Sequence, residues 1–240
     1  MDGLLTETDW HAAPADAPPA MSALRQRAAA LLRGAIRCSP LRRRVLWSLP
    51  PACGAVALTF DDGPNPEWTP RVLEVLAAHQ ATASFFLLGG KASEHPELVR
   101  RLAAEGHSIG SHSLSHRNLR QLSRIEAQRE IRGAEEALQT ILGHRPRWFR
   151  PPYGAFSPVG LWETTRRGVR TVLWNVDPRD YRSGSADRIL ARLGPLRAGD
   201  VVLLHDKFAG LVEALPEILA RIADAGLRAA SLDVATSRAA

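Results

Sequence analysis

From residue 54 onward, the chain alternates short apolar runs with segments whose apolar residues recur at helical spacing. Strand followed by helix, repeated roughly seven times, is typical of a parallel sheet with crossover helices. We therefore expect an α/β fold whose reactive side chains lie at the carboxyl ends of the strands. The runs interpreted as strands are 55–60, 83–88, 108–111, 148–150, 171–175, 201–205 and 228–232. The segments interpreted as helices are 70–79, 96–105, 124–142, 158–167, 186–193 and 211–225.

Length and composition narrow the class of protein further. The chain has 240 residues, of which 45% are hydrophobic and 23% charged, so it is long enough to bury a full core and is not disordered throughout. Its two cysteines, Cys38 and Cys53, are too few for a disulfide scaffold or a four-cysteine zinc site.

The net charge of +6 could indicate a nucleic-acid partner, so the position of the charges along the chain matters. Residues 1–16 carry four acids and no Lys or Arg, whereas residues 17–60 carry seven arginines and no acid, which leaves +3 for the rest of the chain. Most of the basicity therefore lies in an N-terminal arm. No nucleic-acid-binding motif accompanies it, so we expect no nucleic-acid partner.

The N-terminal region divides into a leader and an arm. We expect a disordered leader at 1–20, a basic arm at 21–52 that begins with an amphipathic helix, and a catalytic domain at 53–240. The arm has three interpretations: a helix docked on the domain, a peripheral contact with an anionic membrane through residues 21–44, and an organelle transit sequence that starts at Met21. No convincing signal peptide or membrane span is present, so we expect a cytoplasmic or membrane-peripheral protein.

Two of the predicted strand ends supply candidate metal ligands. Asp61 and Asp62 follow the first strand, and adjacent carboxylates repel one another unless a cation lies beside them. His112 and His116 follow the third strand, and on a helical turn two histidines four apart face the same way. Asp62 with both histidines would make a three-ligand site with open positions, which is typical of a catalytic metal. An acidic surface turn and a solvated histidine pair remain the alternatives.

Three further strand ends carry charged side chains. Arg150 lies in a loop stiffened by two prolines, where it suits a fixed partner for a carboxylate. Asp180 lies in a segment of acids and aromatics after the predicted strand 171–175. His205 ends an apolar strand, as a proton donor would, although a lone histidine is more often structural.

Together, the five motifs resemble the polysaccharide deacetylase family, the NodB homology domain of carbohydrate esterase family four. The resemblance covers about residues 53–235 and implies a distorted (β/α) barrel with about seven parallel strands, preceded here by the basic amphipathic helix. Members of that family hydrolyse N-acetyl, and occasionally formyl or O-acetyl, groups of sugars. The five motifs occupy 59–64, 111–116, 149–154, 174–181 and 201–206.

The resemblance implies roles for the general base, its partner and the metal ligands. Asp61 would be the general base, oriented by Arg150. Asp62, His112 and His116 would hold a divalent metal, usually zinc, although cobalt or another divalent ion also suits these ligands. The metal would polarise the acyl carbonyl and activate a water molecule.

The same resemblance implies the acid and the substrate contacts. His205 would protonate the departing amine, and Asp180 would favour its protonated form. The backbone N–H of Tyr153 would stabilise the oxyanion, and Leu203 would line the pocket for the acetyl methyl group. Tyr181 stands where the family commonly has tryptophan; both rings can pack on a sugar.

These roles predict a metal-dependent hydrolase that removes N-acetyl groups from an oligo- or polysaccharide containing N-acetylglucosamine. One alternative is a deformylase or deacetylase of a lipid-linked sugar at the cytoplasmic membrane face, which the basic arm motivates. Another is a catalytically inactive glycan-binding module. The expected partner is an acetylated glycan, and nothing in the sequence indicates an oligomeric state.

Overall fold

A computed structural model of the protein describes residues 44–155, 157–182 and 184–237. The leader at 1–20 and the helix expected at the start of the arm lie outside the described residues. Arg44–Ala240 form one compact unit. Residues 44–52, which we assigned to the arm from the sequence, therefore belong to the same unit as the predicted catalytic domain.

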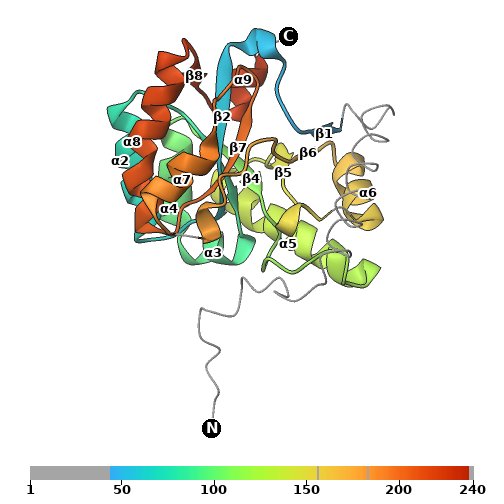
Figure 1. Cartoon of the computed structure of the whole chain (residues 1–240). Helices are drawn as coiled ribbons and strands as arrows, with labels where there is room; N and C mark the ends of the chain where they lie inside the picture. Colours follow the sequence, from blue (N-terminus) through green and yellow to red (C-terminus); the bar gives the residue numbers. More distant parts are fainter. Residues whose placement is uncertain (1–43, 156, 183, 238–240) are drawn as a thin grey trace. The chain divides into compact units, whose positions relative to one another are not determined.

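The centre of this unit is a sheet in which every described strand pair is parallel (Figure 1). Its strands follow the order β1-β6-β5-β4-β3-β2-β7, and β8 pairs with β2 off this path. The strands are β1 (Val45–Leu46), β2 (Ala55–Gly63), β3 (Ser84–Leu87), β4 (Ser108–Ser111), β5 (Trp148–Phe149), β6 (Arg170–Val172), β7 (Val201–His205) and β8 (Arg228–Ala229).

The two edges of the sheet approach one another after β6. An isolated parallel bridge joins Val176 to Val202 of β7, and the backbone N–H of Leu49 donates to the carbonyl of Gly199. These contacts curl the sheet towards a barrel without a continuous ladder between β1 and β7. The predicted fold class, an α/β fold with a distorted barrel of about seven parallel strands, is confirmed.

The helices lie outside the sheet, and α2, α7 and α8 cover β2 and β7 (Figure 1). The α-helices are α2 (Trp68–Ala78), α3 (Gly89–Glu94), α4 (Pro96–Ala104), α5 (Arg124–Leu142), α6 (Pro158–Arg166), α7 (Ala186–Leu193), α8 (Ala209–Asp224) and α9 (Leu232–Ser237). Short 3-10 turns are η3 (Pro51–Cys53), η4 (Pro152–Gly154) and η5 (Asp180–Arg182). None of the described helices is long and apolar enough to cross a membrane.

The two faces of β2 and β7 carry different side chains because successive residues of a strand point to opposite sides. Val56, Leu58, Val202 and Leu204 pack against the helices. Ala55, Ala57 and Val201 face an inner cluster with Phe86 and Trp148. By the same alternation Thr59, Asp61, Leu203 and His205 continue the inner face towards the carboxyl ends, so polar side chains end inside the barrel mouth.

Candidate active site

Asp61 and Asp62 lie at the end of β2 with different backbone conformations. Asp61 pairs with His205 in the parallel register between β2 and β7. Asp62 has a φ of 71°, and the register with β3 shifts between Asp61 and Gly63. Because of this irregularity, the two adjacent carboxylates point in different directions. Asp61 contacts Arg150, whereas Asp62 contacts the histidines after β4.

Asp62, His112 and His116 converge on one point. Asp62 Oδ1 lies 3.5 Å from His112 Nε2 and 3.1 Å from His116 Nε2, and one ligand atom from each residue lies within 4.8 Å of the others. The helical turn predicted for the histidines is wrong. Residues 112–116 form a loop in which Ser113 and His116 have positive φ, and this loop, not helical periodicity, brings the two rings together.

The hydrogen bonds and charges of these three residues suit a divalent cation. His112 Nδ1 lies 2.8 Å from the carbonyl oxygen of Arg150 and donates to it, so Nε2 is the ring nitrogen that faces Asp62. Burial, with the neighbouring His112, lowers the pKa of His116 to about 3, so its ring is neutral. Burial raises the pKa of Asp62, but His112, His205 and His116 outweigh it and hold that pKa well below its usual value. Asp62 Oδ1 is buried without a hydrogen-bond partner, as a metal-binding oxygen would be.

Arg150 is fully buried and fixes Asp61. Its Nη1 donates to Asp61 Oδ1 at 2.7 Å and to Thr59 Oγ1 at 2.8 Å. The rest of the guanidinium donates to the carbonyls of Val172 and Leu173 at the end of β6. These bonds hold the guanidinium in place, and through it one oxygen of Asp61.

On the other side of the site, Asp180 holds His205. The Asp180 carboxylate lies 2.9 Å from His205 Nδ1 and also accepts from the backbone N–H of His205 at 2.6 Å. Burial disfavours the charged imidazolium, but Asp180, supported by Asp62 and Asp61, outweighs it and raises the pKa of His205 to about 9. His205 is therefore protonated at neutral pH.

The three predicted substrate-contacting residues border these groups. The exposed Tyr153 lies in η4 with a φ of 59°, and its ring centroid is 4.7 Å from that of His116. Tyr181 meets the His205 ring edge to face at 5.3 Å. Leu203 is buried two residues before His205 on the same strand face. All ten predicted site residues thus belong to one constellation at the carboxyl ends of the strands.

Thr59 and Lys207 also touch this constellation, and neither was predicted as a site residue. Thr59 accepts from Arg150 and donates to the carbonyl of Val202 at 2.5 Å. Lys207 Nζ lies 2.6 Å from Asp62 Oδ2, the oxygen that does not face the histidines. Lys207 directly follows the motif at 201–206, so its position beside a reactive strand end is the signal that would have found it.

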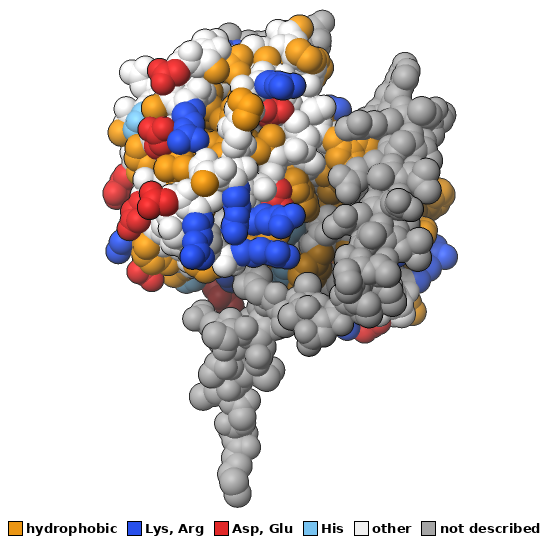
Figure 2. Space-filling view, viewed as in Figure 1, with side chains coloured by type: hydrophobic (Ala, Val, Ile, Leu, Met, Phe, Trp, Pro, Cys, Tyr) orange, Lys and Arg blue, Asp and Glu red, His pale blue; other side chains and the backbone are white. Residues whose placement is uncertain are grey.

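Exposed arginines lie beside Tyr181. The Arg182 guanidinium is 6.0 Å from the Tyr181 ring, and Arg192 contacts the carbonyl of Arg179 at 3.5 Å. In the view of Figure 2, Lys and Arg side chains gather in the lower half of the described surface.

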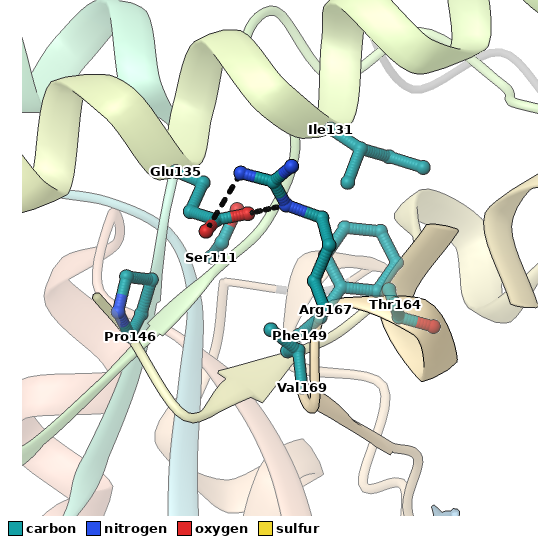
Figure 3. A pocket seen from close by; sticks show the side chains of 8 residues that line it. All are labelled: Ser111, Ile131, Glu135, Pro146, Phe149, Thr164, Arg167 and Val169. Carbon is teal, nitrogen blue, oxygen red and sulfur yellow. Dashed lines mark hydrogen bonds and ion pairs between the residues drawn. The ribbon is translucent and has the colours of Figure 1, made fainter. Parts of the chain in front are cut away.

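A small cavity between the sheet and the helices contains none of the ten predicted site residues. It lies between α5, β5 and α6, and the ion pair of Glu135 and Arg167 borders it (Figure 3). Ile131, Phe149 and Val169 form its apolar walls. Because its only charged side chains neutralise one another, it does not compete with the strand ends as a reactive site.

Comparison with known proteins identifies related chains. A sequence model described as polysaccharide deacetylase matches residues 49–172. A peptidoglycan-N-acetylglucosamine deacetylase of Bacillus cereus is 40% identical over 182 residues, which are 74% of this chain and 66% of that protein. A chitooligosaccharide deacetylase of Sinorhizobium fredii is 40% identical over 154 residues, 63% of this chain and 72% of that protein.

Solved structures agree with these relatives. The crystal structure of a peptidoglycan N-acetylglucosamine deacetylase superposes with a TM-score of 0.75 at 38% identity, covering 79% of this chain and 91% of that one. A pseudoenzyme of carbohydrate esterase family four from Bacillus anthracis superposes with a TM-score of 0.74 at 25% identity, covering 79% of this chain and 67% of that one. The chain belongs to the polysaccharide deacetylase family, the NodB homology group of carbohydrate deacetylases.

Proposed function

We propose that this protein is a metal-dependent hydrolase that removes N-acetyl groups from a glycan containing N-acetylglucosamine. The observation that carries the proposal is the pairing of Asp61 with His205 across β2 and β7. Each of the two has a buried partner of opposite charge, Arg150 for Asp61 and Asp180 for His205. Two titratable groups with opposed electrostatic partners beside one cation site are suited to work as base and acid.

The metal is the first requirement of the proposal. Asp62, His112 and His116 would hold a divalent ion, with zinc favoured by two imidazoles and one carboxylate. Bound there, such an ion would polarise the acyl carbonyl and lower the pKa of a water molecule. The neutral imidazole of His116 and the ionised Asp62 support this assignment, because both are the ligand forms of these side chains.

Asp61 is proposed as the base that accepts a proton from the attacking water. Its second oxygen, Oδ2, lies 3.7 Å from His112 Nε2, so Asp61 reaches the metal-binding centre while Oδ1 is held by Arg150. A carboxylate fixed on one oxygen offers the other for proton transfer in a single direction.

His205 is proposed as the acid that protonates the leaving amine. An amine leaves poorly as an anion, so the proton must be present when the carbon–nitrogen bond breaks. The raised pKa of His205 keeps this proton on the ring at neutral pH. Asp180, bonded to Nδ1, leaves Nε2 as the donor towards the substrate.

The proposed substrate contacts complete the site. The backbone N–H of Tyr153 would donate to the developing oxyanion, and Leu203 would contact the acetyl methyl group. Tyr181 would pack against a sugar ring beside His205. N-acetylglucosamine is the proposed sugar because the relatives named above are deacetylases of peptidoglycan N-acetylglucosamine and chitooligosaccharides. The intact set of base, acid and ligand side chains favours an enzyme over an inactive glycan-binding module.

Two substitutions test this mechanism. Asp61→Asn and His205→Ala should each abolish acetate release from N-acetylated chitooligosaccharides, while circular dichroism and zinc content remain those of the wild type. Glu97→Gln, on the exposed face of α4, is the control and should keep full activity. Wild-type turnover in either site variant would overturn the assignment of base and acid.

A further inference from the structure

Glu130 is a buried acid whose charge is not matched by a base. It lies on α5, is 6% exposed, and forms no ion pair with any of the residues that the structure describes. Two other glutamates, Glu135 and Glu163, are also buried, and each of them pairs with arginine. A carboxylate kept in the interior without a cation needs hydrogen bonds in compensation.

Among the residues that the structure describes, the Glu130 side chain forms hydrogen bonds only with the loop that carries the two histidines of the proposed metal site. Its Oε2 accepts from the backbone N–H of Leu114 at 3.1 Å and of Ser115 at 2.9 Å. Its Oε1 accepts from Ser115 Oγ at 2.6 Å. Leu114 and Ser115 lie between His112 and His116 in the chain, so Glu130 binds the middle of the loop.

The loop needs such an anchor because its backbone is unusual. Ser113 and His116 both have positive φ, which non-glycine residues adopt only where the surroundings require it. On the α3 side, the N–H groups of Gly89 and Gly90 donate to the carbonyls of Ser113 and Leu114. Glu130 accepts on the α5 side, so the loop is held from both flanks.

The side chain of Leu114 fixes how deeply the loop sits between the two helices. A Cβ on Gly89 would lie 2.5 Å from Ala134 Cα and 3.1 Å from Leu114, and a Cβ on Gly133 would lie 3.1 Å from Leu114. The two glycines therefore let α3 and α5 close on Leu114. The hydrogen bonds that Glu130 accepts then fix the loop backbone at Leu114 and Ser115.

We propose that Glu130 is a positioning residue that holds His116 in its place beside Asp62 and thereby sets metal affinity. The inference rests on the proposed metal site. Without Glu130, the N–H groups of Leu114 and Ser115 lose their acceptor and the loop can leave its positive-φ conformation. His116 Nε2 would then move away from Asp62, while His112, held by its contact with the Arg150 carbonyl, would stay.

Chelator competition with zinc measures this effect directly. Glu130→Ala should weaken zinc binding by about 10- to 100-fold, as is usual when a partner of a metal ligand is lost. Glu130→Gln keeps a carbonyl for the two N–H groups and should lie between Glu130→Ala and the wild type. Glu135→Gln is the matched control, because it changes the same buried side chain on the same helix but contacts Arg167 instead of the loop.

The variants separate positioning from general stability. Glu135→Gln should lower the melting temperature but leave zinc affinity within about threefold of wild type, and saturating zinc should restore turnover in Glu130→Ala. Should Glu130→Ala fail to fold, Glu130→Gln decides. Wild-type zinc affinity in folded Glu130→Ala or Glu130→Gln would overturn the inference while leaving the proposed function intact. A wild-type protein that binds no metal would overturn the proposed function itself.

Discussion

Asp180→Asn is the substitution whose effect the structure defines most sharply. It removes the carboxylate 2.9 Å from His205 Nδ1 while keeping the shape of the side chain. The pKa of His205 is raised from 6.5 to about 9 against the opposing effect of burial, with Asp180 as the largest favourable cause. At 1.36 kcal/mol for each pKa unit, this difference is about 3 kcal/mol of preference for the imidazolium. Without Asp180, we expect the pKa of His205 to fall to 6.5 or below.

The consequence for activity depends on pH. With a pKa of about 9, about nine-tenths of His205 is protonated at pH 8, and with a pKa of 6.5 this fraction falls to about 0.03. Asp180→Asn should therefore lose about 30-fold in kcat/KM at pH 8 and recover most of this loss at pH 5.5. The pH at which kcat/KM falls on the alkaline side of the profile should be lower by at least about two pH units.

The assay combines rate profiles with a direct titration. Acetate release is measured from pH 5 to 10, and the His205 ring is titrated by NMR in the metal-free proteins. A dication on Asp62 would lower the pKa of His205 in both proteins, so the difference between wild type and variant is the quantity compared. Asp177→Asn is the control, since Asp177 lies near His205 without a hydrogen bond to it, and should shift the limb much less. An unchanged alkaline limb in Asp180→Asn would refute the reasoning.

The raised pKa of His205 also makes the free energy of unfolding depend on pH. Because the pKa of His205 is higher in the folded protein than in the unfolded chain, the stabilisation is fully present below about pH 6.5 and is lost as pH rises through about 9. Thr59→Val should lower the free energy of unfolding, measured in urea, by about 1–3 kcal/mol and should lower kcat, because Arg150 loses an acceptor. An unchanged unfolding midpoint would contradict this. Gly154→Ala should lower the melting temperature and turnover, because φ is +60° and the new Cβ would lie 2.8 Å from Trp174; wild-type values would show that η4 adapts. Ser123→Ala should cost about 1 kcal/mol through loss of the α5 capping box and leave kcat unchanged, and a fall in kcat of the folded variant would link the cap to the site.

Elements with a clear local pattern could be predicted from the sequence. The strands at Ser108–Ser111 and Val201–His205 and the helices at Arg124–Leu142 and Ala186–Leu193 have the predicted bounds. The strand Val201–His205 begins with a run of four apolar residues, and α5 opens with a capping box, so both leave a strong signal. The predicted strand 171–175 instead ends at Val172, from which the chain turns towards β7.

Elements without a local pattern could not be predicted. The strand Val45–Leu46 is too short for any periodicity and exists only because it pairs with β6. Gly89–Glu94 begins with two glycines, which are poor helix formers, yet it is helical because it packs on α5.

The ten candidate residues could be selected from the sequence because each lies in a recognisable motif at a predicted strand end. The shape of the histidine loop could not be predicted, because the spacing of His112 and His116 fits a helical turn as well as the observed loop. Lys207 directly follows the last motif, so its place in the chain could have indicated it. Glu130 acts through contacts across 15 or 16 residues of chain, which no local pattern reveals.

Acetate release by metal-stripped protein tests the central claim most directly. The protein is treated with a chelator, dialysed, and assayed on N-acetylated chitooligosaccharides, peptidoglycan fragments and a formylated sugar, with and without one equivalent of zinc or cobalt. We predict no release from the stripped protein and acetate release from a glycan containing N-acetylglucosamine once metal is returned. Release that is indifferent to the chelator, or no acetate from any substrate with either metal, would contradict a metal-dependent N-deacetylase.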